Sequence, residues 1–157
     1  MFVVYVQTGR ELEVTAALRK KDFTAYAPRR IVRYRKGGVN YCVPEILFDG
    51  YVFVDLPVID SYDYYAIRAV PGVGNFISRS CPISSAEEEY ILKLCNNGAD
   101  IDISKGYIEN GVLKIKSGFL KHLEHKIVRY SKRQHRATVE VNVHGVPHRV
   151  VCGIDIE

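Results

Sequence analysis

The segment from Leu47 to Leu56, with the sequence LFDGYVFVDL, constrains the fold more than any other part of the chain. Alternation along it, with a kink at Asp49-Gly50, predicts two apolar faces: Phe48, Val52 and Val54 on one, and Leu47, Tyr51 and Phe53 on the other. A strand with bulky apolar side chains on both faces is central in its domain, or a partner covers one face. Burial of all three aromatic rings is the ordinary interpretation. A surplus aromatic face is the alternative, and it would be a docking surface.

The charge of the chain is unevenly spread. Residues 1–104 carry 12 Lys and Arg against 13 Asp and Glu, whereas residues 105–157 carry 10 against 5 and all five histidines. A basic surface of this density favours a polyanionic partner, and nucleic acid above all. The alternative is a solvated basic surface that has no partner.

Length and cysteine usage suggest the class of protein. A chain of 157 residues holds one domain or two small ones. It contains no apolar run of about 18 residues, so no membrane-spanning helix is expected. None of the cysteines belongs to a CxxC pair, which predicts reduced thiols in a cytoplasmic protein. The cysteines are Cys42, Cys81, Cys95 and Cys152.

Periodicity and capping residues predict an α+β sandwich over residues 1–98. The expected elements are strands at 2–6, 25–35, 39–43, 51–56 and 75–78, and helices at 11–21, 61–69 and 85–95. Residues 99–108 lack a clear period and are expected to be a linker. From 109 to 157 the pattern predicts short strands and no helix, typical of a small β-barrel domain. Its many Val and Ile residues favour strands over a helical hairpin.

Two clusters of basic residues are candidate nucleic-acid contacts. Nine of the sixteen residues from Lys121 to Arg136 are Lys, Arg or His, and only Glu124 is acidic. The expected RNA contacts are Lys121, Lys126, Arg129, Lys132, Arg133 and Arg136, with Tyr130 as a ring on which a base could stack. On the first hairpin, alternation places Arg29, Arg33 and Arg35 on one face as a candidate DNA contact. A charged edge that protects the hairpin from aggregation is an equally good interpretation.

Enzyme chemistry is weakly supported. The two histidine pairs, His122 with His125 and His144 with His148, do not supply three or four ligands that converge on one point. No glycine-rich phosphate loop is present. We therefore expect no catalytic residue, no metal and no cofactor. Cleavage of RNA by a histidine pair stays open as an alternative.

Several motifs in order resemble the NusG family of transcription elongation factors. The opening VVYVQTGRE, the segment Leu47–Val54, the segment Ile67–Val73 and the acidic helix after Pro82 are similar to successive family motifs. Val112–Phe119 looks like the opening of a KOW barrel. Two positions depart from the family pattern: Asp49 stands where a proline is usual, and Leu120–Val128 lacks the usual KOW glycine.

The resemblance implies a NusG-type sandwich followed by a KOW barrel, and a factor that binds the clamp helices of the largest RNA polymerase subunit. Tyr5, Phe48, Tyr51 and Phe53 match the family's polymerase-binding positions. The expected protein is a monomeric antiterminator of the LoaP or RfaH type whose barrel binds RNA, expected to be a structured leader element. Non-template DNA and a ribosomal protein are further expected partners. A ribosome-associated KOW protein that only positions RNA is the alternative.

Overall fold

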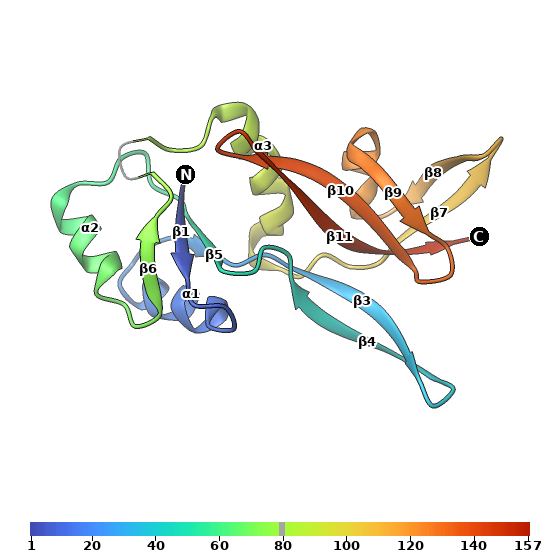
Figure 1. Cartoon of the computed structure of the whole chain (residues 1–157), viewed down its shortest axis with the longest axis horizontal. Coiled ribbons are helices and arrows are strands. Elements are labelled where there is room, and N and C mark those ends of the chain that lie inside the picture. The colour runs from blue at the N-terminus through green and yellow to red at the C-terminus, as the bar shows by residue number, and fades with distance from the viewer. Residues whose placement is uncertain (79–80) are drawn as a thin grey trace. The chain divides into compact units, whose positions relative to one another are not determined.

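A computed structural model describes residues 1–78 and 81–157 (Figure 1), and their contacts divide the chain into two units. The first unit comprises Met1–Ala27 and Phe48–Gly98, and the second comprises Pro28–Leu47 and Ala99–Glu157. The first combines helices with a sheet, and the second is built mainly of strands. The expected α+β class is therefore confirmed. No helix in the described residues is long and apolar enough to cross a bilayer.

The first unit contains a four-stranded sheet. Its strand order is β2-β5-β1-β6, from β2 (Ala25–Tyr26), β5 (Tyr51–Val54), β1 (Phe2–Val6) and β6 (Val73–Phe76). The central strand β1 is antiparallel to both neighbours, with Phe2 opposite Val54 and Tyr5 opposite Tyr51. Because β1 and β5 lie side by side in the middle of the sheet, their alternate residues define its two faces.

The described residues of the first unit also form the α-helices α1 (Glu11–Lys20), α2 (Ser61–Arg68) and α3 (Ser85–Cys95), and a 3₁₀ turn, η1 (Asn96–Gly98), follows α3. Asp60 and Ser84 cap α2 and α3, each by accepting a hydrogen bond from a backbone N–H three residues on. Val14 and Leu18 of α1 and Ile67 of α2 are buried with Val4 and Val52 in one cluster. Helices α1 and α2 thus cover the sheet face that carries the aliphatic residues of β1 and β5.

The second unit contains a curled five-stranded sheet, which confirms the expected KOW-like barrel. Its strand order is β8-β7-β11-β10-β9, from β8 (Val112–Ser117), β7 (Ser104–Glu109), β11 (Val146–Ile156), β10 (Arg136–Val143) and β9 (Ile127–Ser131). The chain has strand structure here and no helical hairpin. A 3₁₀ segment, η2 (Phe119–Lys126), follows β8, where the expected KOW glycine is missing.

Two local expectations for the second unit were wrong. Strand β7 begins inside the segment expected to be a linker and continues past its end, and η2 lies in a domain expected to contain no helix. Strand β7 has no apolar period of its own because Ser104 and Gly106 occupy its buried positions. Gly106 is required there: an added Cβ would lie 2.8 Å from the Lys114 carbonyl oxygen. Pairing with β8 and β11, rather than local propensity, makes this segment a strand.

The β3–β4 hairpin, β3 (Arg29–Lys36) with β4 (Val39–Ile46), belongs to the second unit, although the expected boundary assigned it to residues 1–98. Strand β3 lies beside β11 (Figure 1). At Gly153 of β11 an added Cβ would lie 2.5 Å from the Ile31 carbonyl oxygen. Ile31 N–H also donates to the Ile101 carbonyl at 2.7 Å. These backbone contacts join the hairpin to the C-terminal segment.

Candidate functional sites

Four aromatic residues of the first unit form one cluster on a single sheet face: Tyr5, Phe48, Tyr51 and Phe53. The rings of Tyr5 and Tyr51 are 5.5 Å apart, and Phe48 lies 6.3 Å from Tyr51 and 5.3 Å from Phe53. Phe48 therefore lies on the side of Tyr51 and Phe53. The prediction that placed it with Val52 and Val54 was wrong. Phe48 precedes the strand, and Tyr51 N–H donates to the Phe48 carbonyl across the Asp49-Gly50 turn, so strand alternation does not extend to it.

Exposure separates the four expected polymerase-binding residues into two layers. Phe53 is fully buried and Phe48 is 4% exposed, whereas Tyr5 is 45% exposed and Tyr51 is half-buried. Burial, and then the proximity of Tyr5, raises the pKa of the Tyr51 hydroxyl. Of these four described residues, Tyr5 and Tyr51, hereafter the tyrosine pair, are accessible to a partner, and the two phenylalanines are not. The two phenylalanines support the pair from beneath.

The expected RNA contacts in the second unit are not equivalent. Lys121, Arg129 and Arg133 are exposed, on η2, β9 and the β9–β10 turn. Lys132 is exposed as well, but its Nζ donates to the Glu157 carbonyl at 3.1 Å. Lys126, at the end of η2, is half-buried. Of these cations, Lys121, Arg129 and Arg133 are exposed and form no hydrogen bond to a backbone group of the residues that the structure describes.

Arg136 turns toward the hairpin instead of solvent. Its Nη1 donates to the carbonyls of Arg33 at 3.0 Å and Gln134 at 2.9 Å. Its guanidinium lies 4.9 Å from the centroid of the Tyr34 ring. Arg136 therefore joins the β9–β10 turn to the hairpin, as a positioning residue for that contact.

Two of the three arginines expected to contact DNA are neutralised by carboxylates. Arg29 forms a bidentate pair with Asp100 at 2.8 and 3.0 Å, and Arg33 forms another with Asp155 at 2.6 and 3.0 Å. Their partners lie 71 and 122 residues away in sequence, so the hairpin sequence could not reveal them. Arg35 is exposed and forms no ion pair with any residue that the structure describes.

A pocket of about 510 Å³, open to solvent, lies between the hairpin and the β9–β10 turn; it is hereafter called the arginine pocket. Its lining contains four arginines and no carboxylate: Arg33, Tyr34, Arg35, Asn40, Arg133, Gln134, His135 and Arg136. A second pocket of about 510 Å³ shares Tyr34, Gln134 and Arg136 with it and extends to Arg129. Sequence reasoning missed Tyr34, Asn40 and Gln134 because only the packing of the hairpin brings them to the cations.

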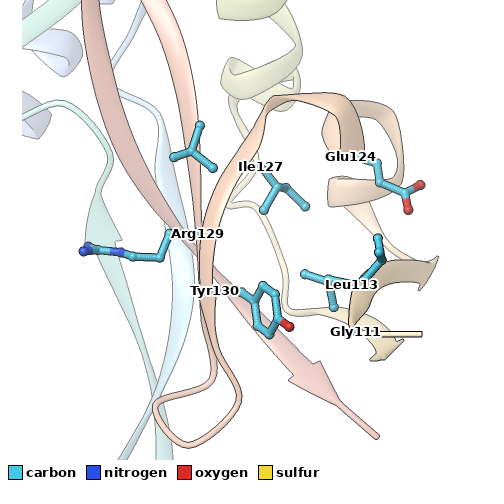
Figure 2. A pocket seen from close by; sticks show the side chains of 8 residues that line it. Gly111, Leu113, Glu124, Ile127, Arg129 and Tyr130 are labelled. Carbon is cyan, nitrogen blue, oxygen red and sulfur yellow. The ribbon is translucent and has the colours of Figure 1, made fainter. Parts of the chain in front are cut away.

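Tyr130, the expected base-stacking residue, does not line the arginine pocket; it lines the second pocket and also a third cavity (Figure 2). With Leu113 and Ile127 it borders a pocket of about 450 Å³ between the edge strands β8 and β9. Figure 2 shows the Arg129 side chain pointing to the opposite side of β9 from the Tyr130 ring. The Tyr130 ring is therefore directed away from the Arg129 side chain, whereas the Tyr34 ring lies against the Arg136 guanidinium.

The remaining titratable groups do not form a site. Among the described residues no three His, Cys, Asp or Glu side chains are grouped to hold a metal ion. His135 Nδ1 lies 3.4 Å from Asp155, which already pairs with Arg33. Burial lowers the pKa of His148. The four cysteines are free, and burial raises the pKa of Cys95 and of Cys152 to about 12.

A unit of helices on a four-stranded sheet and a unit with a curled five-stranded sheet make this a two-part α+β protein. Residues 1–92 match the family model described as transcription termination factor nusG. The chain belongs to the NusG family.

Known proteins agree with this assignment. The chain is 31% identical over 107 residues to the transcription termination/antitermination protein NusG of Bacillus subtilis, and 27% identical over 110 residues to that of Thermus thermophilus. Each match covers 59% of this chain and 60% of the relative, so the chain spans about 60% of the length of these curated relatives. A solved structure of Thermotoga maritima NusG, described by its domain interaction, shares the fold with a TM-score of 0.55 and 23% identity, and the match covers 97% of this chain and 92% of that one.

Proposed function

We propose that this protein is a transcription elongation factor that binds RNA polymerase and promotes processive antitermination. The observation that carries the proposal is the tyrosine pair, an exposed aromatic surface inside the segment that matches the NusG family model. The expected partner is the pair of clamp helices of the largest polymerase subunit. A factor bound there acts without catalysis, because it shifts polymerase away from paused states by binding the elongating state more tightly.

The two layers of the aromatic cluster suit this role. Tyr5 and Tyr51 lie on adjacent strands in register, so their positions are fixed by the sheet. Phe48 and Phe53 fill the space beneath them and hold the rings in place. Exposed aromatic side chains on a rigid support are typical anchors of protein interfaces.

The test is binding of the whole chain to purified bacterial RNA polymerase. Truncation of an anchoring ring costs about 2 kcal/mol, so Tyr5→Ala and Tyr51→Ala should each weaken binding roughly thirty-fold. Tyr62→Ala is the matched control, because Tyr62 is 79% exposed on α2, outside the aromatic cluster. Wild-type affinity in the Tyr5→Ala, Tyr51→Ala double variant would refute the interface. Transcription through a terminator with the same proteins then measures antitermination.

We further propose that this protein is a specialised paralogue of the LoaP or RfaH type and that the basic surface of its second unit binds RNA. The support is the charge excess of residues 105–157 and the exposed side chains of Lys121, Arg129 and Arg133. Lys126, Lys132 and Arg136 add positive charge nearby. If about four cations reach phosphates of a single strand, log affinity should fall with log salt at a slope near −3. An affinity that does not change with salt would refute RNA binding through this surface. Non-template DNA and a ribosomal protein stay among the proposed partners.

A further inference from the structure

The hairpin and the β9–β10 turn each place one exposed arginine at the arginine pocket. Arg35 comes from β3, and Arg133 comes from the turn. Neither forms an ion pair with the residues that the structure describes, whereas Arg33 is held by Asp155. The pocket therefore has two cations available to a ligand and two more, Arg33 and Arg136, fixed in its wall.

The acidic groups nearby are already occupied. Glu45 pairs with Arg30 at 3.0 Å and accepts a short hydrogen bond from the Tyr34 hydroxyl. Asp155 accepts both hydrogen bonds from Arg33. With these carboxylates bound to partners and no acid in the lining, the pocket carries an uncompensated positive charge. Such a pocket suits an anionic ligand that has more than one charged oxygen.

The size and the polar lining of the pocket indicate what kind of anion it is. A pocket of about 510 Å³ between the hairpin strands and the β9–β10 turn is in the range of small-ligand sites, so it can hold a short stretch of one strand but not a duplex. Asn40 and Gln134 add amide groups that can both donate and accept hydrogen bonds. Such groups can bind a ribose 2′-hydroxyl, which distinguishes RNA from DNA.

We propose that a single-stranded segment of RNA binds in the arginine pocket, with Arg35 and Arg133 on its phosphates and Asn40 or Gln134 on a ribose hydroxyl. The hairpin, expected from its sequence to meet DNA, then supplies half of an RNA site whose other half is the β9–β10 turn. The adjoining pocket extends the path toward Arg129. This inference rests on the proposed RNA binding and assigns its location.

The experiment measures fluorescence anisotropy of the full-length protein with a short, unstructured, end-labelled RNA. A charge-assisted hydrogen bond is strong enough that Arg35→Gln and Arg133→Gln should each weaken binding about tenfold at low salt. The double variant should reduce the magnitude of the salt slope by about 1.4, because each lost contact to a single strand removes about 0.7. Both residues are exposed, so the variants should keep the wild-type circular dichroism spectrum.

Arg149→Gln is the matched control, since Arg149 is an exposed arginine of the same unit that does not line either pocket. It should bind RNA like the wild type. A loss of affinity in Arg133→Gln but none in Arg35→Gln would overturn the shared pocket while leaving RNA binding by the second unit intact. No RNA binding by the wild type at low salt would instead refute the proposed function itself.

A DNA strand of the same sequence is the second arm. Weaker binding of the DNA by the wild type, with a smaller difference in the Asn40→Ala, Gln134→Ala double variant, supports recognition of the ribose hydroxyl. Equal affinity for DNA and RNA would overturn the assignment of RNA as the ligand.

Discussion

The tyrosine pair and the arginine pocket are assembled in different ways. Tyr5 and Tyr51 face each other on neighbouring strands of one sheet, so strand pairing alone brings their rings together. The arginine pocket needs the hairpin and the β9–β10 turn, whose contact residues Arg33 and Arg136 are 103 residues apart in sequence. The residues of a sheet face can be predicted from alternation along the strands. The cations that are available to a ligand cannot, because long-range packing decides which of them are paired with carboxylates.

The two surfaces also depend on different forces. The tyrosine pair rests on buried phenylalanines, so its geometry depends on apolar packing. The arginine pocket depends on ion pairs and backbone contacts that fix the hairpin against β11. Removal of a buried phenylalanine ring should therefore act mainly on the stability of the first unit, and removal of an exposed arginine should act mainly on binding by the second.

The largest expected effect is on the rate of chemical labelling of cysteines, because each unit buries one thiol and protects it from a thiol reagent. Cys95 and Cys152 are buried, whereas Cys42 and Cys81 are exposed. At pH 8 a thiol reagent should label the exposed pair on the order of 10³-fold faster or more, because the buried pair requires unfolding. Mass spectrometry of labelled peptides measures the four rates. Rapid labelling of Cys152 alone would mean that the second unit is much less stable than the first.

The same two thiols give a dependence of stability on pH. Burial raises their pKa to about 12 in the folded chain from an ordinary value of 9.0. The unfolded chain therefore loses thiol protons first as the pH rises, so their contribution to stability is complete below about pH 9 and falls between about pH 9 and 12. Denaturant unfolding of Cys95→Ala and Cys152→Ala beside the wild type should show a weaker decline in each variant.

The next effect sharpens the distinction between the layers of the aromatic cluster. Phe48→Ala should reduce the free energy of unfolding by about 3–5 kcal/mol, because a buried ring leaves a cavity. Tyr5→Ala should cost less than about 1.5 kcal/mol, since its ring is 45% exposed. Denaturant unfolding of the two variants measures both values. Equal losses would mean that the four aromatic residues form one core and that no docking layer exists.

Gly153→Ala should break the contact between hairpin and sheet. The added Cβ would lie 2.5 Å from a backbone oxygen of Ile31, which cannot rotate away. A loss of about 1–3 kcal/mol is expected for such overpacking. Gly74→Ala in the first unit is the control, because its added Cβ would meet its nearest atom at an ordinary 3.5 Å. Thermal unfolding tests stability, and a parallel loss of RNA affinity would show that the pocket needs the docked hairpin.

Much of the fold could be predicted from local sequence. Alternation gave β1 with its observed bounds, and the capping residues Asp60 and Ser84 gave the starts of α2 and α3. Strand β7 could not be predicted, because its glycine and serine at buried positions become strand residues only through pairing with β8 and β11. The aromatic and basic candidate residues could also be identified from the sequence, but not which of them are exposed to solvent or unpaired with a carboxylate. Those properties depend on the Asp49-Gly50 turn and on Asp100 and Asp155, which lie far from the hairpin in sequence.

The smallest expected effect is that of Asp155→Asn, which should lower the stability of the fold slightly and strengthen RNA binding slightly. Asp155→Asn removes the ion pair to Arg33, whose side chains are 30% and 32% exposed, so the unfolding free energy should fall by only about 1 kcal/mol or less. The same change removes a negative charge next to the arginine pocket, so RNA should bind a few-fold more tightly at low salt, and this gain should shrink as salt rises. Glu140→Gln removes a comparable carboxylate of the same unit from its pair with Arg149, outside both pockets. Anisotropy with both variants decides whether position matters: an equal gain in the two would mean that RNA responds to total charge rather than to the pocket.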